Sequence, residues 1–166
     1  MILKVLQLPD PLLKKPARSV HFNDPHLQLL IDHMLETMYH HPRCVGLAAP
    51  QVGQSLRVIT VDASRVDRPG SRHGRLVLLN PVITRRQELH LLREGCLSIP
   101  DFTGNVLRDD RVEVTGLDRK GQPLKISANG FEAVVFQHEV DHLDGKLFLD
   151  RVASLETDVF RRKQYA

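Results

Sequence analysis

Residues 137–142 read Gln-His-Glu-Val-Asp-His, so two histidines lie four positions apart and a glutamate directly follows the first. On an α-helix, His138 and His142 share one face one turn apart, where both rings can bind the same metal ion. Glu139 lies about 100° around the helix from His138, beside such an ion, where a carboxylate can act on metal-bound water. The pattern is typical of the helix of metal-dependent hydrolases.

The helix that carries these histidines is predicted to be buried. Its apolar residues Phe131, Val134 and Val135 lie at helical spacing on the same face as His138 and His142. Gly145 follows, and glycine often ends a helix. Because the metal-binding face and the apolar face coincide, the site is expected inside the protein, where a cation acts strongly on bound water.

Length and composition predict a single globular domain that spans residues 1–166, since 42% of the chain is hydrophobic and 26% is charged. No apolar run approaches the roughly 18 residues that cross a bilayer, and the N-terminus lacks the features of a secretory signal. We therefore expect a cytoplasmic protein without membrane contact. The two cysteines, Cys44 and Cys96, are expected to be reduced.

The first half of the chain predicts an extended arm followed by a helix. Three prolines within the first 20 residues exclude a continuous helix there. Asn23 or Asp24 can cap a helix that begins at Pro25, and apolar residues then follow at helical spacing to Met38.

The rest of the chain predicts strands followed by helices. Short β-branched and leucine runs between about residues 55 and 114 predict strands, with a surface loop over 65–74. Residues 118–121, Asp-Arg-Lys-Gly, are typical of a hairpin turn. A final helix, capped by Ser154, is predicted to run to the C-terminus.

A metal site on the histidine helix requires a third donor, and Cys96 lies 42 residues before His138. One thiolate and two imidazoles would leave one position for water, as in catalytic zinc sites. The alternative is a buried and inert cysteine, since cysteine is among the most buried residue types. Spacing alone does not decide between the two interpretations.

Three segments together resemble the signature sequences of the peptide deformylase family: residues 46–51 (Gly-Leu-Ala-Ala-Pro-Gln), 94–98 (Glu-Gly-Cys-Leu-Ser) and 137–142. The resemblance covers nearly the whole chain. It implies an α+β single domain in which mixed or antiparallel β-sheets wrap a central helix with the HExxH motif, with further helices near the N- and C-termini. It also implies a metal-dependent hydrolase that removes the formyl group from formyl-methionine of newly synthesised polypeptides and releases formate.

The resemblance assigns roles to particular residues. It implies that Cys96, His138 and His142 bind the metal, that Glu139 is the general acid and base, and that Gln51 and the backbone N–H of Leu97 face the substrate oxygen. Without the resemblance, Gln51 is an ordinary turn residue. The implied apolar slot for methionine comprises Val45, Gly46, Leu92, Phe131, Val134 and Val135.

Further expectations concern the ion and its surroundings. The resemblance implies Fe²⁺, whereas the ligand set itself also suits Zn²⁺, Ni²⁺ or Co²⁺. An ion pair between Glu94 and Arg108 is expected to fix the strand of Cys96. The family's first signature usually begins Gly-x-Gly-Leu, but this chain has Cys44 at the first glycine. If residue 44 needs a positive φ, or must let substrate pass closely, this side chain narrows the cleft.

The formal net charge is +3, with basic residues concentrated at Arg151 and in residues 160–165. Such a basic tail can meet an acidic partner such as RNA, so we expect docking on the ribosome but no DNA partner. The substrates that the resemblance implies are N-formylmethionyl nascent peptides. The alternative is a solvated helix end that complements the helix dipole.

Three other functions are compatible with the residues alone. The first is a zinc peptidase that uses the same helix on longer peptides. The second is a non-catalytic relative that binds formylated peptide or docks on the ribosome through its basic tail. The third is a hydrolase in which Cys96 is a nucleophile paired with a histidine.

Overall fold

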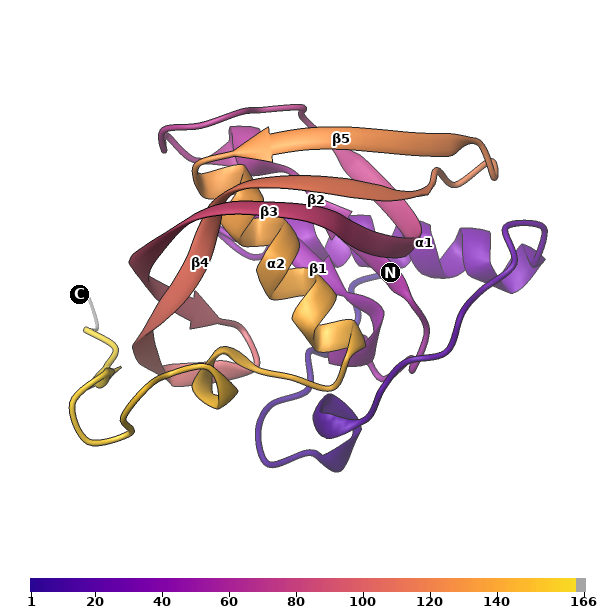
Figure 1. Ribbon diagram of the computed structural model, residues 1–166. Coiled ribbons are helices and arrows are strands. Elements are labelled where there is room, and N and C mark those ends of the chain that lie inside the picture. Colours follow the sequence, from indigo (N-terminus) through magenta and orange to yellow (C-terminus); the bar gives the residue numbers. More distant parts are fainter. Residues whose placement is uncertain (164–166) are drawn as a thin grey trace.

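The helix α2 (Phe131–Leu143) is the centre of the fold, and the strands of an antiparallel sheet surround it (Figure 1). The computed structural model describes residues 1–163. Gly130 precedes α2 with φ 63° and Gly145 follows it with φ 72°, so glycines in the left-handed region delimit the helix at both ends. The prediction of a buried helix that ends near Gly145 is confirmed.

The described residues form one six-stranded sheet in the order β1-β2-β3-β4-β5, with β6 paired to β4. All pairs of these strands are antiparallel. The strands are β1 (Gly46–Ala48), β2 (Val58–Val61), β3 (Leu76–Cys96), β4 (Ile99–Leu117), β5 (Pro123–Asn129) and β6 (Val159–Arg161). The predicted turn over 118–121 joins β4 to β5, where the N–H of Asp118 donates to the carbonyl of Gln122 at 2.8 Å.

The long strands β3 and β4 curve around α2 (Figure 1). Breaks in their pairing register, the last of them between Gly95 and Cys96, are bulges that bend the ladder. Side chains alternate across it: Val106 and Arg108 are buried toward α2, whereas Leu107 is exposed. The buried side chains of β3 and β4 therefore lie on the face that encloses the helix.

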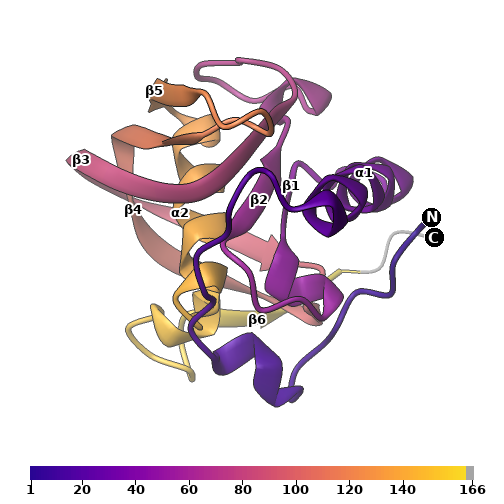
Figure 2. The same cartoon turned by 90° about the vertical axis from the view of Figure 1, so that its right-hand side faces the viewer.

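The helix α1 (Pro25–His40) covers the other side of β1 and β2, which lie between α1 and α2 (Figure 2). Its N-cap is Asp24, whose side chain accepts a hydrogen bond from the N–H of His26, so the predicted start is confirmed. Buried apolar residues of α1 pack in one cluster with residues of β1 and β2; they are Leu27, Ile31, Met34, Leu35 and Met38.

The N-terminal arm is extended, as predicted, apart from the 3₁₀ turn η1 (Pro11–Lys14). It contacts two of the signature segments directly. The N–H of Leu6 donates to the carbonyl of Gln51 at 2.7 Å, and the N–H of Leu8 donates to that of Ser98 at 2.9 Å. The arm therefore holds two chain segments that border α2.

The predicted C-terminal helix is wrong. Ser154 does cap a turn, since its Oγ accepts from the N–H groups of Glu156 and Thr157, but the chain then continues as β6. The edge of β4 at Phe102–Gly104 was free to accept a strand, and the β-branched and aromatic residues Val159 and Phe160 suit one. Long-range pairing thus replaced the local helix. Residues 164–166, also assigned to that helix and tail, lie outside the described residues.

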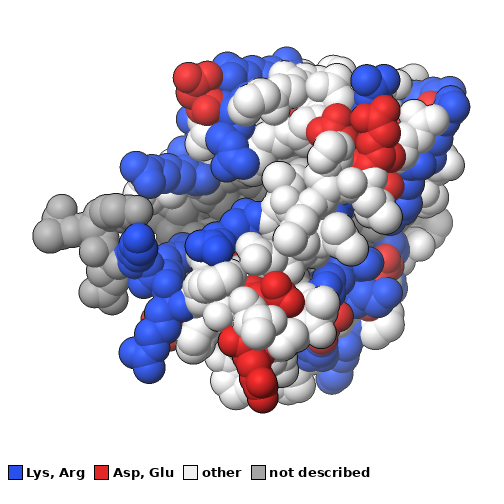
Figure 3. Space-filling model, turned by 60° about the vertical axis from the view of Figure 1, so that its left-hand side comes forward, with Lys and Arg blue, Asp and Glu red and all other residues white. Residues whose placement is uncertain are grey.

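Basic side chains gather around this end of the chain. Arg161, Arg162 and Lys163 are exposed, and the guanidinium of Arg93 lies 3.7 Å from the centre of the Phe160 ring. Figure 3 shows Lys and Arg side chains gathered on the left of that view. Separately, no helix among residues 1–163 is both long enough and apolar enough to cross a membrane.

Candidate metal centre

Cys96, His138 and His142 converge in the interior. Cys96 is the last residue of β3, while the two histidines lie on α2. The Cys96 sulfur is 3.4 Å from Nε2 of His142, and the donor atoms of all three residues lie within 4.8 Å of one another. The structure therefore brings together the third donor and the histidine pair that the sequence nominated.

The spacing of these donors suits a metal ion. Bonds of about 2.3 Å to sulfur and 2.0–2.1 Å to nitrogen, at a tetrahedral angle, separate the two donor atoms by about 3.5 Å. The observed 3.4 Å between Cys96 Sγ and His142 Nε2 is close to this value. One sulfur and two imidazole nitrogens are also the donor types that zinc and related transition metals prefer. The chemistry and the geometry of this group therefore both fit a divalent transition-metal ion.

Glu139 lies beside the three donors, and its side chain is buried. In residues 1–163, only Oε2 of Glu139 and Nδ1 of His142 are buried side-chain polar atoms without a hydrogen-bond partner. The other buried acidic and amide side chains of α2 have protein partners, as for Gln137, which bonds both backbone groups of Asp109. Burial raises the pKa of Glu139 to about 7. A buried carboxyl group of this kind, whose Oε2 has no protein partner, can exchange a proton near neutral pH.

Glu94 fixes the ring of His138. Oε1 of Glu94 lies 2.7 Å from Nδ1 of His138, which leaves Nε2 on the side of the other donors. Although burial opposes ionisation of Glu94, hydrogen bonds from His138 and Arg108 lower its pKa to about 2. A carboxylate on the outer nitrogen of a ligand histidine sets its tautomer and its orientation.

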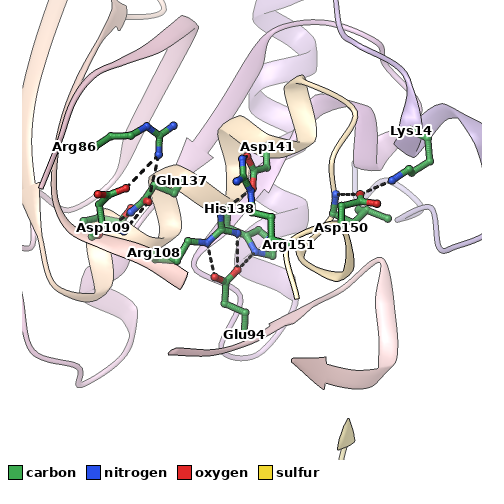
Figure 4. A network of polar contacts seen from close by, with 12 residues as sticks. Lys14, Arg86, Glu94, Arg108, Asp109, Gln137, His138, Asp141, Asp150 and Arg151 are labelled. Carbon is green, nitrogen blue, oxygen red and sulfur yellow. Dashed lines mark hydrogen bonds and ion pairs between the residues drawn. The ribbon is translucent and has the colours of Figure 1, made fainter. Parts of the chain in front are cut away.

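The expected ion pair between Glu94 and Arg108 is present and is part of a larger network (Figure 4). Arg108 donates to both carboxylate oxygens of Glu94, at 2.5 and 3.0 Å. Its third bond, 2.7 Å long, goes to Asp141, which also accepts two bonds from Arg151. The sequence analysis assigned no role to Asp141, although its place between the two histidines was a signal for one.

Gln51 and Leu97 lie at the edge of the same site. The amide nitrogen of Gln51 is 3.4 Å from the Cys96 sulfur and 3.2 Å from Oγ of Ser98. Its amide oxygen accepts from the N–H of Ala48 at 3.0 Å, so the orientation of the side chain is fixed. Leu97 begins the two-residue turn between β3 and β4, directly after Cys96.

The residues nominated for the methionine slot lie on α2, on β3 and in and directly before β1. Phe131, Val134 and Val135 lie on the first turns of α2, and Val45 packs against the same core cluster as Phe131 and Val135. Leu92 is half-buried on β3, four residues before Cys96. The guanidinium of Arg68, in the loop before β3, lies 4.5 Å from the centre of the Phe131 ring.

Cys44 does not occupy a strained backbone position. The left-handed residue in this segment is Arg43, with φ 62°. The Cys44 thiol donates to the carbonyl of Gly46 at 3.2 Å, and both cysteines are free thiols. Burial, together with the charge of Glu139, raises the pKa of Cys44 to about 12. The Cys44 side chain is therefore a neutral packing group, and it lies outside the cluster of metal donors.

These features define a metal-dependent hydrolase of the HExxH class: an antiparallel sheet around a helix with two histidines, a cysteine donor, and a glutamate whose buried Oε2 has no protein partner. Residues 2–158 match the family model described as polypeptide deformylase. The chain belongs to this family, whose members are metal-dependent hydrolases that remove the N-terminal formyl group from nascent polypeptides.

Individual relatives agree along nearly the whole chain. The peptide deformylase of Syntrophobacter fumaroxidans is 46% identical over 98% of this chain and 93% of its own length. That of Thermodesulfovibrio yellowstonii is also 46% identical, over 98% of this chain and 96% of its own length. The crystal structure of a peptide deformylase from Legionella pneumophila has a TM-score of 0.85 and 42% identity, and the match covers 94% of this chain and 89% of that one.

Proposed function

We propose that this chain performs the deformylase reaction at the centre formed by Cys96, His138 and His142, with Glu139 as the group that transfers the proton. The observation that carries the proposal is the convergence of these three donors, within 4.8 Å, beside a buried glutamate whose Oε2 has no protein partner. The reaction is the hydrolysis of an amide. Water adds to the formyl carbon, the carbon–nitrogen bond breaks, and the products are formate and a free amine.

In this proposal, Cys96 Sγ and the Nε2 atoms of the two histidines hold the ion. A bound divalent cation supplies Lewis acidity, which brings the pKa of water close to neutral. Glu94 keeps Nε2 of His138 directed at the ion through its bond to Nδ1. The sheet and the apolar residues around α2 exclude bulk solvent, which strengthens electrostatic interactions at the site.

Glu139 accepts the proton of the attacking water and later delivers it to the departing amine nitrogen. Both transfers require a group that gains and loses a proton near the working pH, and burial raises the pKa of Glu139 to about 7. The free Oε2 is the atom available for this exchange.

Negative charge develops on the formyl oxygen as water adds. We assign its stabilisation to the Gln51 amide nitrogen and the backbone N–H of Leu97, which border Cys96 from two different elements. Gln51 would turn its N–H from the Ser98 hydroxyl toward the substrate oxygen, while Ala48 holds its amide oxygen in place. Each such donor contributes roughly 2.7–4 kcal/mol to transition-state stabilisation in other hydrolases.

The apolar residues Val45, Leu92, Phe131, Val134 and Val135, together with the backbone at Gly46, form the proposed slot for the methionine side chain. One relative supports a methionine-first peptide: the crystal structure of the Acinetobacter baumannii class I type b peptide deformylase is described as bound to Met-Ala-Ser. It is 38% identical to this chain, with a TM-score of 0.84, and the match covers 92% of this chain and 99% of that one. A site that fits one hydrogen on the carbonyl carbon rejects an acetyl group by size.

We propose Fe²⁺ as the ion in the cell, with Zn²⁺, Ni²⁺ or Co²⁺ as substitutes that the same donors accept. Anaerobic purification followed by metal analysis tests this assignment. Iron at about one equivalent supports it, and zinc as the main ion under strictly anaerobic handling contradicts it.

We further propose that the protein works in the cytoplasm on nascent chains and docks on the ribosome through its basic C-terminal segment. The exposed side chains of Arg161, Arg162 and Lys163 support this partner, because RNA attracts clustered positive charge. Reversal of the charges of Arg161 and Lys163 should weaken sedimentation with ribosomes and leave activity on a short formylated peptide unchanged. Arg162 is kept in this variant, because its guanidinium packs against Gly95, next to Cys96.

The central experiment measures formate released from formyl-Met-Ala-Ser by the wild type and by Glu139→Gln. We expect turnover by the wild type, no internal cleavage of unformylated peptides, and loss of turnover in the variant with its metal content retained. Cleavage of unformylated peptides would favour a zinc peptidase, and absence of turnover in both proteins would favour a non-catalytic binder. Activity that survives complete removal of metal would favour Cys96 as a nucleophile.

A further inference from the structure

Asp141 is a buried carboxylate shared by two arginines. Arg108 Nη1 donates to Oδ2 of Asp141 at 2.7 Å from the interior side. Arg151 donates to both carboxylate oxygens from the solvent side, through Nε at 2.5 Å and Nη2 at 2.7 Å. The side chain of Asp141 is 6% exposed and that of Arg151 is 35% exposed. Arg151 is therefore the outermost member of a network that leads inward (Figure 4).

The position of Arg151 is fixed by the segment in front of it. The 3₁₀ turn η4 (Phe148–Asp150) ends at Arg151, whose N–H donates to the carbonyl of Phe148 at 3.0 Å. The ring of Phe148 is buried and packs against Gly104 of β4, where an added Cβ would lie 2.9 Å from it. Asp150 forms an ion pair with Lys14 of η1. The backbone of Arg151 is thus held by a segment that belongs to neither α2 nor the β3–β4 pair.

From Asp141 the contacts continue to a metal ligand. Arg108 bridges Asp141 and Glu94, and Glu94 bonds Nδ1 of His138 at 2.7 Å. Charges alternate along this path, with two carboxylates and two guanidinium groups. If Arg151 were absent, two buried carboxylates would compete for the single guanidinium of Arg108. Arg108 already donates to both carboxylates and, in this geometry, cannot also replace the two bonds that Asp141 would lose. Asp141 would therefore draw Arg108 away from Glu94, and the bonds between Arg108 and Glu94 would weaken.

We propose that Arg151 is a positioning residue for the metal ligand His138, acting through Asp141, Arg108 and Glu94. This inference depends on the proposed metal centre. Arg151 touches neither the ligands nor the substrate, so its effect is on how firmly the His138 ring is oriented. Outer partners of ligand histidines commonly change metal affinity by 10- to 100-fold, and a residue three contacts further out is expected near the lower end, at about tenfold.

The test compares Arg151→Met with the matched control Arg57→Met. Arg57 also pairs with an acidic residue at the end of α2, since its Nη1 lies 3.0 Å from Asp144 Oδ1, but that pair has no contact with Glu94 or Arg108. The dissociation constant for Co²⁺ is measured by competition with a chromophoric chelator, and the fold is monitored by circular dichroism. We expect about tenfold weaker Co²⁺ binding in Arg151→Met and little change in Arg57→Met.

A double-mutant cycle identifies the path. In an Asp141→Asn background, adding Arg151→Met should change the Co²⁺ dissociation constant little, because Asp141 is the only proposed link. An equal loss of Co²⁺ affinity in both backgrounds, or an equal loss in Arg57→Met, overturns the inference.

If Arg151→Met fails to fold, Arg151→Lys is used instead. Lysine keeps the charge but cannot donate to both carboxylate oxygens from two fixed nitrogens, and wild-type Co²⁺ affinity in this variant also overturns the inference. Absence of Co²⁺ binding by the wild type, or binding that survives His142→Ala, would instead refute the metal centre itself.

Discussion

Gly46 and Glu139 are in direct contact across the interface of β1 and α2. A Cβ atom added at Gly46 would lie 2.6 Å from Oε1 of Glu139 and 2.8 Å from its Cγ. The space that a side chain would need at position 46 is therefore already filled by the glutamate stem. Glycine at this position allows the carboxyl group of Glu139 to reach its place beside the metal donors.

The first prediction is that Gly46→Ala inactivates the enzyme by displacing Glu139. General acid–base groups contribute about 10²- to 10⁴-fold, so kcat should fall by about 10²-fold or more. Metal content should stay at the wild-type level, because none of the three donors is moved directly. Formate release and metal analysis of the same preparation check both parts. A kcat close to that of the wild type would show that Glu139 relaxes without cost or has no role in proton transfer.

A second prediction concerns Cys44, which stands where the family usually has glycine. Because position 44 is not in the left-handed region, Cys44→Gly should relieve no strain. Loss of the buried side chain should lower the free energy of unfolding by about 1–2 kcal/mol, with little change in KM for formyl-Met-Ala-Ser. Urea denaturation and steady-state kinetics measure the two quantities. A marked fall in KM would instead indicate that the thiol narrows the substrate cleft.

A third prediction concerns the dependence of stability on pH. The Tyr39 hydroxyl, near the end of α1, donates to Oδ2 of Asp62 after β2 at 2.5 Å. Burial and the bond to Asp62 raise the pKa of Tyr39 from 10.0 to about 12. The raised pKa means that the folded state favours the neutral phenol. The contribution of the neutral Tyr39 phenol to the free energy of unfolding is full below pH 10 and is lost between about pH 10 and pH 12.

Tyr39→Phe isolates this contribution. At pH 7 the variant should be less stable by about 1 kcal/mol, since a partly exposed hydrogen bond to a charged group is lost. The difference from the wild type should shrink as the pH rises through the range from 10 to 12. Although burial opposes ionisation of Asp62, hydrogen bonds from Ser64 and Tyr39 lower the pKa of its carboxyl group. Ionised Asp62 therefore adds to the free energy of unfolding above its ordinary pKa, and this contribution declines as the pH falls through the lowered value. A difference that stays constant up to pH 12 would contradict the coupling.

A fourth prediction follows from the burial of the three donors. An ion that binds only the folded protein stabilises it by about 2.7 kcal/mol when its free concentration is 100 times the dissociation constant. The melting temperature should therefore fall when the ion is removed by a chelator and should recover when Co²⁺ is added back. In His142→Ala the chelator should have little effect. Equal melting temperatures of the wild type with and without the ion would argue against the proposed ligands.

Sequence reasoning succeeded where structure depends on local periodicity. The cap at Asp24 and Pro25 gave the start of α1, and the spacing of residues 131–142 gave α2 with both histidines on one face. It failed at residues 154–163, where Ser154 indicated a helix but the chain formed β6. A free strand edge on β4, formed by residues 55 to 59 positions earlier, competed with the local signal, and only the assembled sheet contains that edge.

The pairing of His138 with His142, with Glu139 beside them, was determined by the sequence alone, because the geometry of a helix fixes residues one turn apart. The arrival of Cys96 at that helix was decided by the tertiary structure, since it requires the long β3–β4 pair to bend around α2. The same is true of the network from Glu94 through Arg108 and Asp141 to Arg151, whose members come from four separate segments. Local backbone hydrogen bonds set the first relationship, whereas burial and charge pairing between distant parts of the chain set the others.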